Sequence, residues 1–130
     1  MIFLSLPIQP IAKGRPQFSR RGGAYTPTKT RNFEKEVRTL ASIKMREGNY
    51  RTLSGPLKVN IAFILPKPKR PRSEFPITRP DIDNLAKAVL DALNGVAWED
   101  DGLICNLSLE KSYGIPSILI YVTKLNGETT

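Results

Sequence analysis

The chain has 130 residues, of which 40% are hydrophobic and 25% charged, and it carries a net charge of +8. This length and composition suit one globular domain, residues 1–130, and argue against wholesale disorder. The chain contains no histidine, which excludes Cys/His zinc fingers, Ser-His-Asp triads and nucleases with a histidine base. The single cysteine, Cys105, permits no internal disulfide, and its apolar neighbours predict a core position.

The positive charge predicts a polyanionic partner, because Lys and Arg release counterions when they bind phosphates. No apolar stretch is long enough to span a membrane, and the N-terminus lacks the pattern of a signal peptide. We therefore expect a soluble cytoplasmic protein. An ATP-driven mechanism is not expected, since no phosphate-binding Gly-x-x-x-x-Gly-Lys loop is present.

A first strand is predicted at residues 2–6, and a segment broken by glycines and prolines follows as far as Thr30. No regular element is expected in that segment. Its basic residues alternate with Phe18 and Tyr25, a pattern typical of loops that follow a phosphate backbone and offer a ring to a base. A solvated loop without function is the alternative. Its candidate DNA contacts are Lys13, Arg15, Arg20 and Arg21.

The apolar periodicity then predicts a helix that begins at Thr28 or Thr30, has Thr30 as its N-cap and ends near Gly48. Residues 57–65 read as a strand buried on at least one face. The proline-rich segment that follows predicts an extended second basic loop, with a proline-rich ligand for a partner domain as the rival interpretation. The candidate phosphate contacts of this loop are Lys67, Lys69, Arg70, Arg72 and Arg79.

A second helix is predicted between Arg79 and Gly95, beginning around residues 80–83, because Leu85, Val89 and neighbouring apolar residues form a stripe. Strands are expected at residues 103–109 and 117–123, and their short link predicts an antiparallel hairpin. The order β-α-β-α-β-β predicts an α/β (α+β) domain, with a mixed sheet of about four strands and two helices packed on it. The tail from Asn126 is expected to fray.

Six of the twelve acidic residues lie between Arg79 and Asp101 in an otherwise basic chain. Crowded carboxylates repel one another, so a bound divalent cation is the leading hypothesis. A ligand set of oxygens without His or Cys suits Mg²⁺ or Mn²⁺, and an EF-hand is excluded because Ala86 stands where its Gly is required. Such ions can activate water and stabilise a phosphodiester in hydrolysis.

Simpler explanations exist for each acidic residue. Asp81 or Asp83 can merely cap the helix, and Asp100-Asp101-Gly102 can merely form a turn. Lys87 shares a helix face with Asp83, which suits either an ion pair between them or a contact with the scissile phosphate and attacking water. Asp91 continues that face and is expected to be exposed or salt-bridged.

The run from Arg79 to Gly95, followed by Trp-Glu-Asp-Asp, strongly resembles the RusA-type Holliday-junction resolvases, metal-dependent endodeoxyribonucleases often encoded by phages and prophages. The resemblance extends to residues 13–16, residues 25–27 and Lys111. It implies Mg²⁺ binding by Asp81, Asp83 and Asp101, with Asp100 as a helper, and a need for Lys87 in cleavage. It further implies a homodimer that resolves four-way DNA in recombination and repair by paired symmetric nicks. Leu103 and Gln17 depart from the residues that are frequent in this family, which concerns DNA contacts rather than the metal ligands.

Overall fold

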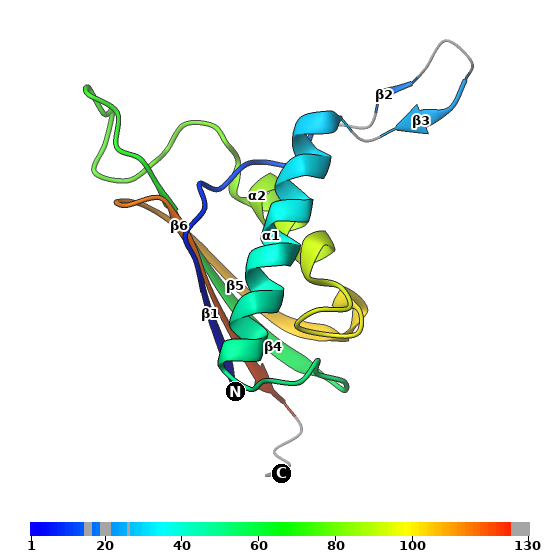
Figure 1. The fold of residues 1–130 in the computed structure, drawn as a ribbon. Helices are drawn as coiled ribbons and strands as arrows, with labels where there is room; N and C mark the ends of the chain where they lie inside the picture. The colour runs from blue at the N-terminus through cyan, green and yellow to red at the C-terminus, as the bar shows by residue number, and fades with distance from the viewer. Residues whose placement is uncertain (15–16, 19–21, 26, 126–130) are drawn as a thin grey trace.

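The protein is described by a computed structural model that covers residues 1–14, 17–18, 22–25 and 27–125. A four-stranded mixed sheet in the order β1-β6-β4-β5 forms its centre, and two helices lie on one face of that sheet (Figure 1). The predicted fold class and the predicted element order are confirmed. The sheet strands are β1 (Ile2–Leu6), β4 (Leu57–Leu65), β5 (Ile104–Tyr113) and β6 (Ser117–Lys124), and the helices are α1 (Thr28–Glu47) and α2 (Ile82–Leu93).

The central strand β4 shows why the sheet has one covered face. Its odd-numbered residues, from Leu57 to Leu65, are buried, whereas Lys58 and Asn60 are exposed. This period of two places apolar side chains under the helices and polar ones on the opposite side. The core joins Phe33, Val37, Ala41 and Met45 of α1 to Leu85, Ala86, Ala88, Val89, Ala92 and Leu93 of α2 and to the buried sheet residues.

The predicted hairpin between the last two strands is wrong. β4 lies between β5 and β6, parallel to β5 and antiparallel to β6. The three-residue link crosses the end of β4, where the Gly114 N–H donates to the Leu65 carbonyl at 2.9 Å. Two strands that flank a third are about 9–10 Å apart, a span that so short a link can bridge. Link length alone therefore did not determine which strands pair.

Three local predictions are also corrected. A two-stranded hairpin, β2 (Gln17–Phe18) with β3 (Ala24–Tyr25), lies in the segment where no regular element was expected. The N-cap of α1 is Pro27, and Thr30 is a buried residue inside the helix. Cys105 is exposed, because it falls at an irregularity of the edge strand: Ile104 pairs with Leu57 and Asn106 with Lys58, so Cys105 has no partner in the register.

Some predicted residues lie outside the described part of the chain, namely Arg15, Arg20, Arg21 and the tail from Asn126. Within the described part, no helix combines the length and apolar character needed to cross a membrane.

Candidate active site

The N-terminus of α2 carries the first two predicted carboxylates. Asp81 occupies the N-cap position, with φ −73° and ψ 143°, but its side chain makes no capping hydrogen bond. Asp83 lies in the first helical turn, and both residues are exposed. Among the described residues neither carboxylate takes part in a hydrogen bond or an ion pair. A purely capping role for the Asp81 side chain is therefore not supported.

The two carboxylates of the following turn have different surroundings. Asp100 Oδ2 accepts the Gly102 N–H at 2.9 Å and so caps the short 3-10 helix η1 (Asp101–Leu103). Asp101 is half-buried, and within the described chain its carboxylate has no hydrogen-bond partner. The simple turn explanation thus accounts for Asp100 but leaves Asp101 available to bind a ligand.

Asp101 and several residues of α2 line one cavity of about 340 Å³. Asn84 and Lys87 of α2 line it together with Asp101, and Lys13, Gly14, Leu90 and Asp91 complete its wall. A neighbouring cavity is lined by Ala12, Arg79, Pro80, Asp81 and again Asn84. Asn84 therefore lies between the Asp81 side and the Asp101 side of the site, a position that sequence reasoning missed although the residue directly follows Asp83.

Lys87 is exposed at this cavity, and the alternative of an ion pair with Asp83 is not found within the described chain. An ammonium group without an internal partner is free to contact an anion from outside. Its presence beside Asp101 matches the arrangement in which a cation meets a substrate phosphate next to acidic residues.

Lys13 was predicted as a DNA contact, and the structure places it against both helices. Its Nζ lies 2.5 Å from Asp91 Oδ2 and 3.5 Å from Glu34 Oε2, and its backbone N–H donates to the Asn84 carbonyl at 3.0 Å. Partial burial lowers the pKa of Lys13, but the two carboxylates outweigh it and raise the pKa above 10.5. Asp91 is salt-bridged, as expected.

The next residue fixes the same segment from its other side. The Gly14 N–H donates to Thr30 Oγ1 at 2.9 Å. A Cβ on Gly14 would lie 2.9 Å from that oxygen, closer than Cβ atoms approach a neighbour, and 3.1 Å from Pro27 Cγ, which is tighter than most such contacts. Only glycine therefore allows this close contact between the segment and α1.

Lys111 of β5 holds the backbone that leads into Asp81. Its Nζ donates to the carbonyl oxygens of Thr78 at 3.2 Å and Pro80 at 3.0 Å. A charged donor shared by two carbonyls fixes the path of the chain just before the N-cap of α2. No local sequence pattern reveals this contact, which joins residues about thirty positions apart.

The turn that carries Asp101 is held by Trp98. This side chain is fully buried, and its Nε1 donates to Asn94 Oδ1 at 2.9 Å. The Glu99 N–H donates to the Leu53 carbonyl at 3.0 Å and the Leu53 N–H donates to the Ala97 carbonyl at 2.9 Å, so the backbone on both sides of the tryptophan is anchored. Asp100 and Asp101 directly follow this fixed point.

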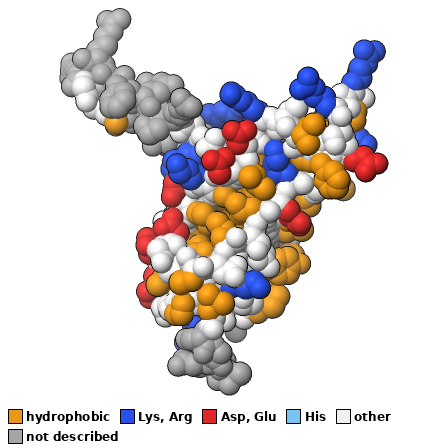
Figure 2. All heavy atoms as spheres, turned by 180° about the vertical axis from the view of Figure 1, so that it is seen from behind, with side chains coloured by type: hydrophobic (Ala, Val, Ile, Leu, Met, Phe, Trp, Pro, Cys, Tyr) orange, Lys and Arg blue, Asp and Glu red, His pale blue; other side chains and the backbone are white. Residues whose placement is uncertain are grey.

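The second basic loop supplies cations around the site. Figure 1 shows this loop and the β2–β3 hairpin projecting from the same end of the molecule, and Figure 2 shows Lys and Arg side chains gathered at that end. None of its predicted phosphate contacts forms an ion pair within the described residues. All of these are exposed: Lys67, Lys69, Arg70, Arg72 and Arg79.

The donor chemistry suits a hard divalent cation, since Asp101 lines one cavity and Asp81 the other, both carboxylates lack partners within the described chain, and the amide of Asn84 lines both cavities. Asp83 is also unpaired within the described chain but lines neither cavity. In the described residues, however, no three acidic or other ligating side chains converge as a preformed cluster. The structure thus places Lys87 with Asp101 in one cavity and Asp81 in the next.

Comparison with known proteins identifies the family of the chain. The family model described as endodeoxyribonuclease RusA matches residues 7–123. The chain belongs to the RusA endodeoxyribonuclease family. Membership of this family supports a Holliday-junction-resolving endonuclease activity. The match spans both basic loops and the acidic residues. The chain is also similar to a protein of Bacillus subtilis (strain 168) named uncharacterized protein YqaN, with 32% identity over 120 residues, covering 81% of this chain and 82% of the relative.

Proposed function

We propose that this RusA-family protein cuts four-way DNA junctions in a Mg²⁺-dependent reaction, by paired symmetric nicks, during recombination and repair. The observation that carries the proposal is the set of uncommitted carboxylates, Asp81, Asp83 and Asp101, at the start and side of α2, together with the five exposed cations of the loop that leads into this helix. Mn²⁺ is the expected substitute for Mg²⁺, because both prefer oxygen ligands.

Asp81, Asp83 and Asp101 would hold the metal, which supplies a water of lowered pKa and stabilises charge on the phosphate. Asp100 supports them, since its bond to the Gly102 N–H orients the turn that carries Asp101. The chain has no histidine, so the proton of the attacking water passes to a carboxylate or to solvent.

Lys87 acts from within the cavity that it shares with Asp101. Its ammonium group donates to a non-bridging oxygen of the scissile phosphate and stabilises the charge that develops there. Lys67, Lys69, Arg70, Arg72 and Arg79 hold flanking phosphates, so that the strand lies across the cavity.

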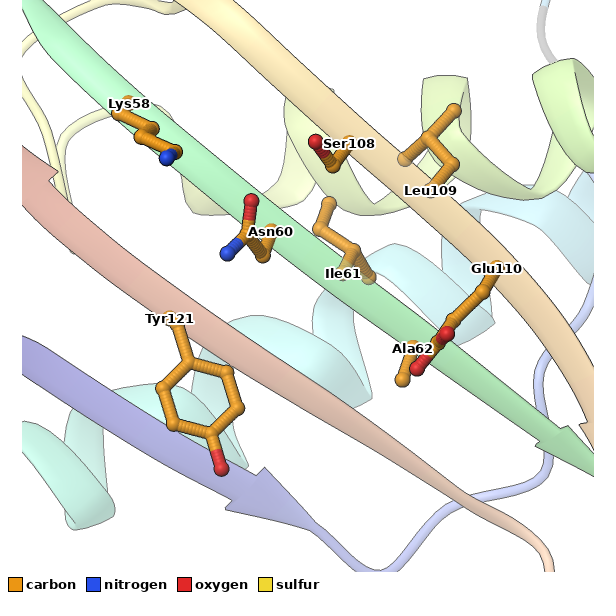
Figure 3. Close-up of a pocket in the computed structure, with 8 residues that line it drawn as sticks. All are labelled: Lys58, Asn60, Ile61, Ala62, Ser108, Leu109, Glu110 and Tyr121. Carbon is orange, nitrogen blue, oxygen red and sulfur yellow. The ribbon is translucent and has the colours of Figure 1, made fainter.

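The protein is expected to act as a homodimer, because a two-fold junction requires two equivalent nicks. The face of the sheet away from the helices suits such a contact. Phe3 and Tyr121 are 38% and 40% exposed there, with ring centroids 4.5 Å apart. Lys58 and Glu110 point from the same face (Figure 3), and neither forms an ion pair within the described chain.

Lys58 pairs in register with Asn106, so Glu110 lies four residues further along β5, about 13 Å away. A two-fold axis can place Lys58 of one copy opposite Glu110 of the other, and this neutral face is unlike the basic DNA-facing end. The Lys58→Glu variant should dissociate the dimer in light scattering, and the Lys58→Glu/Glu110→Lys double variant should restore it. A monomeric wild type, or a double variant no better than the single one, contradicts this interface.

The function is tested by incubating the protein with a synthetic four-way junction and Mg²⁺. Paired nicks at symmetric positions are expected, with no product when EDTA replaces the metal. Salt-sensitive binding without any metal-dependent product would instead identify a non-catalytic nucleic-acid-binding module. Activity confined to small phosphoesters would identify a different phosphohydrolase.

A further inference from the structure

The loop between β4 and α2 exposes large apolar side chains among its cations. Phe75 and Ile77 are 64% and 66% exposed, whereas Pro76 between them is buried. The buried proline anchors the loop to the body of the protein and turns its two neighbours outward. Two large apolar side chains so exposed, two positions apart in one loop, make this loop a candidate interaction surface.

The backbone that presents these side chains is held at several points. The Phe75 N–H donates to Ser73 Oγ at 3.2 Å, and Lys111 holds the carbonyls of Thr78 and Pro80. Phe75 therefore projects from a stretch of chain that is held on its C-terminal side, which lowers the entropy lost when a ligand orders it.

The charge around Phe75 identifies the kind of partner. Five exposed cations surround it in the loop against one acid, Glu74. A protein partner with an apolar groove would have to desolvate these cations, whereas nucleic acid offers phosphates for them and flat apolar base faces for the ring. In regular duplex the base faces are covered by stacking. At the centre of an open four-way junction each of the four base pairs has one uncovered face.

We propose that Phe75 stacks on a base face at the branch point of the DNA, with Ile77 packed against the edge of the same base. This inference rests on the proposed function and adds to it the means of telling a junction from duplex: the loop cations bind both, and the ring finds an accessible face only at the branch. An apolar side chain inserted beside a base step is a recurring way of holding distorted DNA.

The test measures binding without divalent metal, so that affinity is separated from cleavage. Wild type, Phe75→Ala, Phe75→Leu and Phe75→Trp are titrated onto a four-way junction and onto duplex of the same sequence. A 2-aminopurine next to the branch point reports stacking. Lys69→Ala is the matched phosphate-contact variant from the same loop, and Ile43→Ala is the control for an exposed apolar residue, 38% exposed on α1.

Loss of the ring should weaken junction binding roughly ten- to a hundred-fold and leave duplex binding nearly unchanged. Phe75→Trp should retain the affinity and the 2-aminopurine change, whereas Phe75→Leu should lose the change and most of the affinity. Lys69→Ala should weaken both DNAs alike and reduce the salt dependence. Ile43→Ala should match the wild type.

Equal junction affinity of Phe75→Ala and wild type overturns the inference, as does an equal loss on junction and duplex. Wild-type binding and discrimination without any Mg²⁺-dependent nick would sink the proposed nuclease and leave the stacking role standing. Normal junction cleavage by the wild type, together with a junction affinity of Phe75→Ala equal to that of the wild type, would overturn the stacking role and leave the proposed nuclease standing. If the wild type binds no DNA, both the proposed nuclease and the stacking role are wrong.

Discussion

Replacement of Lys111 by Met tests whether a contact remote in sequence positions Asp81. The substitution keeps the length of the stem and removes the ammonium group that donates to Thr78 and Pro80 at 3.2 and 3.0 Å. A hydrogen bond from a charged donor contributes about 1.5–3 kcal/mol when buried, but Lys111 is only half-buried and the Thr78 position is exposed. Discounted for solvent, the pair of bonds should contribute about 1–3 kcal/mol in total.

This free energy should appear as weaker metal binding, because the released segment carries Asp81. At about 1.4 kcal/mol for each factor of ten, metal affinity should fall by roughly ten-fold. Calorimetric titration of Mg²⁺ or Mn²⁺ into the protein without DNA measures the affinity, and thermal unfolding measures stability. Lys124→Met, an exposed lysine at the end of β6, is the matched control and should change neither.

Unchanged metal affinity in Lys111→Met, with the fold intact, would refute the positioning role. A loss of stability with metal affinity at the wild-type level would assign Lys111 to the fold alone.

Three further predictions concern the surroundings of the site. Arg38 Nη1 donates at 2.9 Å to each of two carbonyls at the end of α2, so Arg38→Met should lower the free energy of unfolding by about 1–3 kcal/mol in urea titrations, and an unchanged midpoint would contradict this. The raised pKa of Lys13 means that its pairing stabilises the fold at pH values below 10.5 and that this stabilisation is lost as pH rises through the folded pKa. The stability gap between wild type and Lys13→Met should therefore shrink as the pH rises above 10.5, and a gap that stays constant there would disprove the ion-pair account. Exposed Cys105 should react with a thiol reagent in the native protein at nearly the rate of the unfolded chain. A much slower reaction in the native protein would mean that the thiol is buried and would contradict its exposed position.

Local patterns in the sequence predicted most of the elements. Each of these elements buries one face, and the spacing of its apolar residues reveals that face. Leu85 and Val89 are four positions apart in α2, and Leu57 and Val59 are two apart in β4. The candidate carboxylates were predicted from another local signal, since Asp81 and its neighbours stand out as negative charge within a short stretch, and their role as metal ligands stays a prediction.

Relations between distant segments could not be predicted in this way. The pairing of β5 and β6 with β4 depends on competition among strands, and a short link is compatible with both arrangements. The irregular register that exposes Cys105 has no signal in its neighbours. The contacts of Lys13 with Asp91 and of Lys111 with Pro80 join residues far apart in the chain, so a basic residue in a loop looks the same whether it meets DNA or a carboxylate.

The central claim is tested most directly by single-turnover cleavage of a four-way junction in Mg²⁺ by Asp81→Asn, Asp83→Asn and Asp101→Asn, with Asp100→Asn as the matched control. Asparagine keeps the size of each side chain and removes its charge. The first three variants should bind the junction but cut it at least about 100-fold more slowly, because each loses a metal ligand. Asp100→Asn should lose less than about ten-fold, since its amide oxygen can still accept the Gly102 N–H. Undiminished paired nicking by the Asp83→Asn variant would contradict the account.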